Sequence, residues 1–382
     1  MSKLAEWCRT GTSGEYVKGN YTDGISNMNE LEGIPINQSS FKVLSIAQIQ
    51  NQQRSLEYYW SMTSLSIYHI QNRNGEQYNG SDSQWCGNWD EPCESIQYAI
   101  DLISIKHGSS ITKVKEKNIG ISQYGYDLTT PLQLSKSGSY TDALKIMKQM
   151  YGTSSEIQGQ AEIKILKNID NNKENGKLGW ISATEGLFLH LYSLNIIMDN
   201  SQLLIPIIYI QDSNSLLELN TITFSGIKLS PTTEAKGIIH IKYNNSQFIA
   251  QSCIFSNINI STQGGNAIRI LNSGSYPITS TIKGCQFNNI NSIGDSNGRG
   301  GSAIYMENKY GSKLIIEESC QFQKCLIDKG NGGAIYIEID FASQFEFKIN
   351  NATIRECEAK TDISKDVPPT GYGGGIFLTG SG

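Results

Sequence analysis

Side chains that could carry acid–base chemistry are few in this sequence and do not form one group. Acids gather at Glu317-Glu318 and at Glu338 with Asp340, the pairing that a general acid and a general base need. These two groups occupy different places in the repeat described below, so we do not expect them to meet on neighbouring coils. The four histidines are scattered as His69, His107, His190 and His240. We therefore predict no catalytic residue and no cofactor.

Cysteine is the other reactive side chain, with eight copies in 382 residues. Cys86 and Cys93 enclose six residues and are the best candidates for a disulfide. A zinc site needs about four ligands, and no second pair of Cys or His lies near these two in the sequence. We expect the disulfide and no metal.

Several of the other cysteines belong to a repeat in the second half of the chain. A first ladder of short apolar segments begins at residues 207, 238, 267, 303, 334 and 375, with steps of 29 to 41 residues. A second ladder, which reads Cys-x-Phe in three copies, begins at residues 222, 253, 285, 320 and 352, with steps of 31 to 35 residues. The offset between the ladders stays at 15 to 18 residues. A segment of nearly constant length with insertions elsewhere is typical of stacked coils.

Both ladders alternate apolar and polar residues, as strands with one buried face must. A third alternating stretch lies between them, and its expected inward positions are Leu217/Leu219, Phe248/Ala250, Ile278/Ile282, Leu314/Ile316 and Phe345/Phe347. We predict an all-β chain that forms a right-handed, single-stranded parallel β-helix with three strands per coil. Equivalent residues of successive coils should stack about 4.8 Å apart.

Two interior columns follow from the second ladder. One contains Phe255, Phe287 and Phe322, and the other contains Cys253, Cys285 and Cys320. We interpret the cysteine column as buried packing, with disulfides or a metal site as the alternative. Cys325 and Cys357 also fall at equivalent positions, where a bond between adjacent coils is geometrically possible.

Outward side chains of the first ladder form a candidate binding surface. The aromatic stripe and its arginine are Tyr209, Arg269, Tyr305, Tyr336 and Phe377. Such a stripe is suited to stacking on sugar rings or to docking another chain. The structural alternative is stacking between neighbouring strands under the cover of an inserted loop.

Composition argues against two kinds of partner. Lys and Arg number 31 against 36 Asp and Glu, so the net charge of -5 lacks the positive excess that nucleic-acid binding demands. The longest apolar run, from Leu203 to Ile210, is interrupted by Pro206 and is too short to span a membrane. The N-terminal residues lack the apolar core of a secretion signal. We expect no nucleic-acid partner and no membrane-spanning segment.

The repeated Gly-Gly-Ala-Ile and Cys-x-Phe segments, as in residues 332–335 and 320–322, resemble the polymorphic outer membrane proteins of intracellular bacteria. They are similar also to β-helix proteins of protist surfaces, and the likeness covers about residues 206 to 382. The short helical pattern from Ser95 to Asp101 resembles the N-terminal cap of pectin-lyase-like β-helices. These resemblances imply an extracellular or cell-surface location.

The expected organisation is an irregular region over residues 1–84 and a capped β-helix over residues 85–382, with clear repeats over 206–382. We expect a further helix from Thr141 to Met150, and a chain that ends inside a coil as a fragment of a longer protein. The predicted function is a non-catalytic, elongated adhesive or structural scaffold whose partners are glycans or surface proteins. The alternative is a polysaccharide lyase or hydrolase, or a carbohydrate-binding module, on the same fold.

Overall fold

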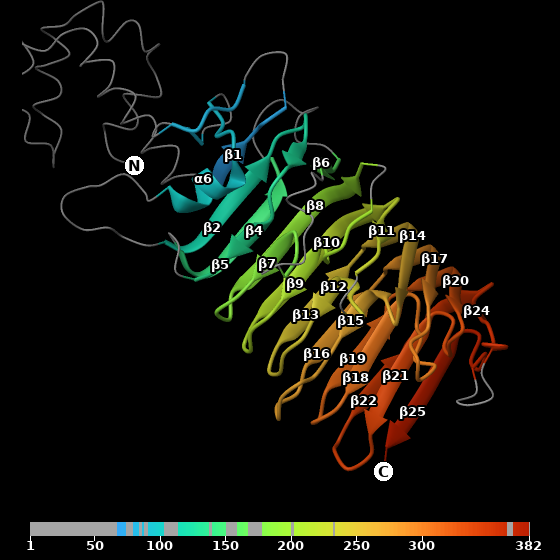
Figure 1. The fold of residues 1–382 in the computed structure, drawn as a ribbon. Helices are drawn as coiled ribbons and strands as arrows, with labels where there is room; N and C mark the ends of the chain where they lie inside the picture. The colour runs from blue at the N-terminus through green and yellow to red at the C-terminus, as the bar shows by residue number, and fades with distance from the viewer. Residues whose placement is uncertain are drawn as a thin grey trace, which may run out of the picture.

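Parallel strands make up nearly all of the regular structure in this protein. The computed structural model describes residues 67–73, 79–83, 86–87, 91–102, 114–136, 140–149, 159–166, 178–199, 202–231, 234–364 and 370–381. Within these ranges there is one short helix, α6 (Ile96–Asp101), and the strands wind into a parallel β-solenoid of about six turns. The coils follow one another along an elongated body from β1 to β25 (Figure 1). The predicted region 1–84 lies largely outside the described residues.

Two parallel sheets form the walls of the solenoid. The larger contains β1 (Ile67–Ile70), β2 (Val114–Ile121), β3 (Tyr126–Leu128), β5 (Tyr140–Lys148), β6 (Ala161–Ile165), β8 (Phe188–Met198), β10 (Leu216–Ser225), β11 (Lys228–Leu229), β13 (Gln247–Gln251), β14 (Ile254–Gln263), β16 (Thr279–Lys283), β17 (Gln286–Ile293), β19 (Lys313–Glu317), β20 (Gln321–Asp328), β22 (Glu346–Ile349), β23 (Thr353–Arg355) and β24 (Glu358–Ala359). The smaller contains β4 (Leu132–Leu134), β7 (Ile181–Ala183), β9 (Ile208–Ile210), β12 (Gly237–Ile241), β15 (Asn266–Ile270), β18 (Ile304–Asn308), β21 (Ile335–Asp340) and β25 (Ile376–Ser381).

The predicted phenylalanine column is confirmed, and it begins one coil earlier than the Cys-x-Phe motif. Phe224, Phe255, Phe287 and Phe322 are paired in register from β10 to β20. Their ring centroids lie 5.0, 4.8 and 4.7 Å apart, and all four side chains are buried. The phenylalanine column is therefore a continuous part of the core that runs through four coils. Burial of such apolar side chains is the main favourable contribution to folding.

The smaller sheet supplies the opposite wall of the core. Its inward isoleucines are in register on successive strands: Ile208, Ile239, Ile268, Ile304, Ile335 and Ile376. Two of these strands are preceded by a glycine, because a side chain would not fit at that position. Gly301 and Gly332 have φ angles of 74° and 69°, and a Cβ at either position would collide with a backbone carbonyl oxygen. The paired glycines therefore shape the corner that leads into each strand.

The third predicted stretch is partly out of register with the structure. Phe248 is followed in its column by Ser280, Leu314 and Phe347, so Ile278 and Phe345 were each aligned two residues too early. Ile278 is nevertheless buried in the core. Ser280 is small and fully buried between larger neighbours. The prediction chose apolar residues only and so passed over a buried serine. Phe345 is instead exposed and meets Phe341 edge to face.

The helix predicted from Thr141 to Met150 was also wrong, because this segment forms β5. The strand pairs in parallel with both β2 and β8. Leu144 and Ile146 alternate into the core, while Lys145 between them forms an ion pair with Glu116 at 2.7 Å. Backbone pairing on both sides has overridden a helical spacing of apolar residues, as tertiary context often does.

The short helix predicted near Ser95 is present as α6. Ser95 accepts a hydrogen bond from the Tyr98 backbone N–H at 3.1 Å, which is the usual role of an N-cap serine. Ile96, Ala99 and Ile100 are buried, and the helix lies against β1 and β2 (Figure 1).

Candidate functional site

The aromatic stripe is a continuous stack on the outer face of the smaller sheet. Tyr209, His240, Arg269, Tyr305, Tyr336 and Phe377 are in register and are called the outward column below. Tyr209 stacks on His240 at 4.9 Å, the Arg269 guanidinium lies 4.2 Å from the Tyr305 ring centroid, and Tyr305 stacks on Tyr336 at 5.6 Å. Tyr336 in turn stacks on Phe377 at 5.4 Å. The predicted alignment of these side chains is confirmed.

Most of the outward column is covered, however, and of its rings only that of Phe377 is partly exposed. Tyr305 is 0% exposed, and Tyr209, Tyr336 and Arg269 are 4%, 5% and 7% exposed. The corner between β17 and β18 carries Arg299, which interacts with Tyr305. A sugar-stacking surface needs open ring faces, so the stripe is unsuitable as the exposed binding surface that we predicted. The alternative of stacking beneath a loop fits these side chains better.

A pair of carboxylates lies beside the outward column. Glu307 of β18 and Glu338 of β21 are direct neighbours in register, and we call them the carboxylate pair. Tyr305 donates a hydrogen bond from its hydroxyl to Glu338 Oε2 at 3.1 Å. Arg299 Nε lies 3.7 Å from the same oxygen, and Lys309 Nζ lies 3.7 Å from Glu307 Oε2.

The surroundings of the two carboxylates differ. Desolvation raises the pKa of Glu307, and Lys309 opposes that rise by attracting the charged form. Glu338 is 22% exposed at its side chain and receives the Tyr305 hydroxyl and the Arg299 guanidinium. Two neighbouring carboxyl groups in different surroundings, one of them with a raised pKa, form an arrangement that general acid and base catalysis uses. Glu307 and Glu338 also form a network with the basic side chains of Arg299 and Lys309. Two acidic and two basic side chains can balance one another's charge without a bound substrate.

Sequence reasoning missed this pair although the signal was available. Glu307 and Glu338 each follow a tyrosine of the outward column by two residues, and positions two apart lie on the same face of a strand. The sequence analysis compared Glu338 only with the acids at Glu317-Glu318 and so found no partner for it. The neighbour of Glu338 in register is Glu307, whereas Glu317 is paired with Lys283, so the two acidic groups do not meet, as expected.

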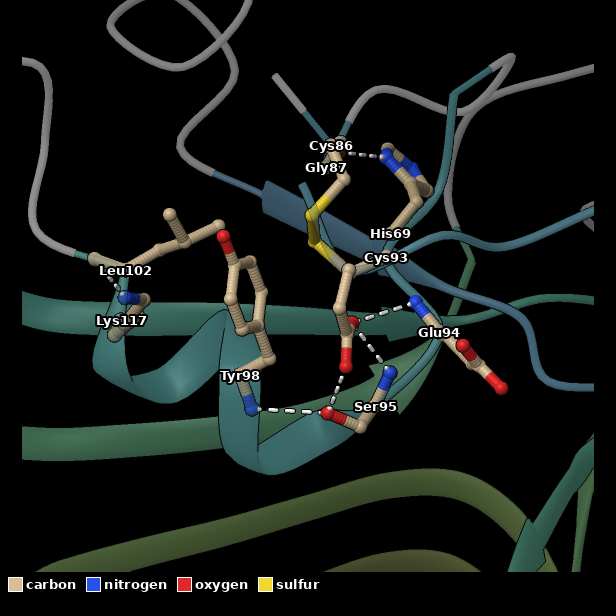
Figure 2. Close-up of a disulfide and its surroundings, with 10 residues drawn as sticks. His69, Cys86, Gly87, Cys93, Glu94, Ser95, Tyr98, Leu102 and Lys117 are labelled. Atoms are coloured by element: carbon tan, nitrogen blue, oxygen red, sulfur yellow. Dashed lines mark hydrogen bonds between the residues drawn. A yellow bond between two sulfur atoms is a disulfide. The ribbon is translucent and has the colours of Figure 1, made fainter. Parts of the chain in front are cut away.

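The predicted disulfide between Cys86 and Cys93 is present near the N-terminal end of the described solenoid. Figure 2 shows it next to His69, whose Nδ1 is 3.1 Å from the Gly87 carbonyl oxygen. Asp82, Cys86 and Cys93 could together hold a metal ion by distance alone. The disulfide uses both sulfur atoms, and the Asp82 carboxylate accepts hydrogen bonds from the Glu94 and Ser95 backbones and the Ser95 hydroxyl. These contacts make the group a structural clamp.

A buried lysine ties α6 to the strand behind it. Lys117 Nζ donates a hydrogen bond to the carbonyl oxygen of Ile100 at 2.9 Å. It donates another to the carbonyl oxygen of Leu102 at 2.6 Å (Figure 2). Burial lowers the pKa of Lys117 to about 7, and Asp101 opposes this shift. His69 is affected in the same direction, since burial lowers its pKa to about 4.

The cysteine column lies in the core as predicted. Cys253, Cys285 and Cys320 are free thiols with no exposed surface. Backbone N–H groups of Cys253 and Cys285 each point to the sulfur of the next cysteine along the column at 3.4 Å. Burial raises the pKa of Cys320 to about 11, so this thiol stays protonated. The column packs as small apolar side chains do.

Comparison with known proteins adds no family to these observations. No protein-family model matches the chain, and no curated protein or solved structure is significantly similar to it. The resemblance to pectin-lyase-like and polymorphic outer membrane proteins therefore stays a prediction. Among the described helices, none has the length and apolar character needed to cross a membrane.

Proposed function

We propose that the protein is a non-catalytic, elongated scaffold of the cell surface or the extracellular space, built as a right-handed β-helix with three strands per coil. The succession of β12, β13 and β14 within one coil, repeated as β15, β16 and β17, supports this coil geometry. The packing of α6 on β1 and β2 supports its role as the N-terminal cap, which would keep the end of the core from water.

The observation that carries the proposal is that outer side chains pair along the solenoid axis with their neighbours on the next coil. Lys283 contacts Glu317 at 2.9 Å, and Lys313 contacts Glu346 at 3.1 Å. Asn289 donates a hydrogen bond to Asn257 at 2.9 Å. Exposed ion pairs contribute little individually, but these contacts join coil to coil in register. Such a surface favours a stiff rod, which suits a spacer or an adhesive wall.

The disulfide near the N-terminal end of the solenoid supports an extracellular or cell-surface location. Disulfides such as Cys86–Cys93 persist in oxidising compartments and are rare in the cytosol. The partners of an adhesive scaffold in that setting would be glycans or other surface proteins. Domain limits are proposed as above, with the β-helix and its cap over residues 85–382.

Two measurements test the scaffold. Small-angle scattering of the full chain should give the profile of a rod, and a profile of a compact sphere would contradict the proposal. Beads coated with the protein should adhere to immobilised glycans or to cells, whereas beads coated with the heat-unfolded chain should not. Equal adhesion by both preparations, or by neither, would remove the adhesive function.

The carboxylate pair favours a second candidate, a polysaccharide-degrading enzyme. Glu307 would act as the general acid, because its pKa is raised by burial, and Glu338 as the second carboxyl group of the pair. Incubation with neutral and acidic polysaccharides, with and without calcium, would reveal activity as released reducing or unsaturated sugar. Loss of that activity in both Glu307→Gln and Glu338→Gln, with Glu346→Gln unaffected as the matched control, would establish the enzyme. If no sugar is released from any polysaccharide, the result would contradict the enzyme and favour the scaffold.

A further inference from the structure

Cys325 and Cys357 occupy the same place on consecutive coils. Gln323 is paired with Arg355 and Leu326 with Glu358, so the two cysteines between these pairs are equivalent positions. Each follows a corner residue with positive φ, which is Lys324 at 53° and Glu356 at 54°. Because the backbones turn in the same way, both side chains leave the corner in the same direction.

Hydrogen bonds orient the two thiols in the same way. Each thiol is directed to a carbonyl oxygen of the preceding coil, Cys325 to Phe287 at 3.8 Å and Cys357 to Phe322 at 3.6 Å. The Cys325 thiol also hydrogen-bonds to the Cys357 sulfur. Neighbouring parallel strands are about 4.8 Å apart, which lies within the Cα–Cα range that a disulfide spans.

Access distinguishes Cys357 from the cysteine column, whereas Cys325 is fully buried. Cys357 is half-buried, whereas Cys253, Cys285 and Cys320 have no exposed surface. The hydrogen bond from Cys325 lowers the pKa of Cys357 to about 7, against the opposing effects of burial and of Glu356. At neutral pH about half of Cys357 is then thiolate, about fifteenfold more than for an ordinary cysteine with a pKa of about 8.5. Thiolate is the reactive form, so this thiol is the reactive one among the free cysteines of the described residues.

We propose that Cys325 and Cys357 form a reversible disulfide between consecutive coils, made by exchange with a low-molecular-weight disulfide such as oxidised glutathione. The Cys357 thiolate attacks one sulfur of the glutathione disulfide, forms a mixed disulfide and releases one glutathione thiolate. Cys325 then loses its proton to that thiolate or to water and attacks the Cys357 sulfur, which releases the second glutathione. The protein loses two electrons and two protons, and the glutathione disulfide gains them.

The bond would fasten the coil that contains β22, β23 and β24 to the coil before it. Phe347, Ile349, Ile354 and Ile376 are only partly buried, unlike their counterparts in earlier coils. A covalent link from β20 to the segment joining β23 and β24 would hold this coil on the previous one. Oxidation would therefore oppose loss of the coil, and reduction would permit it.

Mass mapping of the full chain tests the proposal. Protein reduced mildly and then freed of reductant is incubated with oxidised glutathione, and remaining thiols are alkylated before proteolysis without reductant. We expect a linked peptide pair containing Cys325 and Cys357, and alkylation of the three column cysteines only after unfolding. A thiol reagent should modify Cys357 about threefold faster than an ordinary cysteine at neutral pH, because the larger thiolate fraction is partly offset by the lower nucleophilicity of a low-pKa thiolate.

Single variants separate this route from a fortuitous crosslink. Cys325→Ser should stop the reaction at a mixed disulfide of Cys357 with glutathione, and Cys357→Ser should leave Cys325 reduced. Cys253→Ser, in the buried column, is the matched control and should form the Cys325–Cys357 link as the unchanged protein does. A stable mixed disulfide in the unchanged protein, a Cys357 that remains reduced, or a link from Cys357 to another cysteine would overturn the proposal.

Discussion

Replacing the central phenylalanine of the core column by leucine should cost more stability than replacing the terminal one. Phe287 stacks on Phe255 and on Phe322, at 4.8 and 4.7 Å. Phe224 stacks only on Phe255, since its partner on the other side in register is Ile196. A stacked aromatic pair contributes about 0.5–1.5 kcal/mol beyond the area that it buries. Phe287→Leu therefore loses two such pairs, about 1–3 kcal/mol, and Phe224→Leu loses one.

Urea unfolding followed by far-UV circular dichroism would measure both changes in the free energy of unfolding, provided that the slope with urea is unchanged. The double variant Phe287→Leu with Phe322→Leu should be less destabilised than the sum of the single variants, because the two residues share one contact. Equal losses for Phe287→Leu and Phe224→Leu, or additivity in the double variant, would show that stacking of the rings does not contribute to stability.

Three further variants should change stability, or its dependence on pH, in a known direction. Burial lowers the pKa of His240 well below its usual value, so the unfolded chain takes up a proton below about pH 6.5 that the folded protein does not. His240→Phe should abolish up to about 1.4 kcal/mol of stability loss per pH unit between pH 6.5 and 5, measured by urea titration. The folded protein releases the Lys117 proton near pH 7 and the unfolded chain near 10.5, so stability relative to Lys117→Met should rise between pH 7 and 9. A flat or falling difference would be the opposite result. Serine at both Cys86 and Cys93, which are separated by 7 in sequence, should lower the free energy of unfolding by about 2 kcal/mol in thermal melts.

Interior columns could be predicted because burial restricts their residue types. Phenylalanine, isoleucine and cysteine recur in the core at a nearly fixed spacing, and the predicted alignment of Phe255, Phe287 and Phe322 agrees with the strand register. Ser280 escaped prediction because a small polar side chain in the core gives no apolar signal. The strand β5 was missed because its apolar residues fit helical spacing, and only pairing with β2 and β8 decides the outcome.

The candidate site was harder to predict than the core. The alignment of Tyr305 with Tyr336 follows from the repeat, but their burial depends on how a corner carrying Arg299 folds over the sheet. Corners vary in length and sequence from coil to coil, so the repeat does not specify them. The carboxylate pair could have been predicted from the sequence, since Glu307 and Glu338 each follow one of those tyrosines by two residues. Finding the pair requires that the second outward position of each strand be compared between coils, in addition to the acidic clusters.

Pairing only between consecutive coils has a mechanical consequence. Phe224, Phe255, Phe287 and Phe322 mark equivalent points 31, 32 and 35 residues apart along the chain. Tension applied between the two ends of the chain would load the outermost coil first, because inner coils have partners on both sides. Each detached coil would lengthen the tether by roughly 100 Å, at about 3.3–3.6 Å per extended residue. Under such tension the molecule should lengthen in regular steps, and mechanical work should be dissipated as each coil detaches.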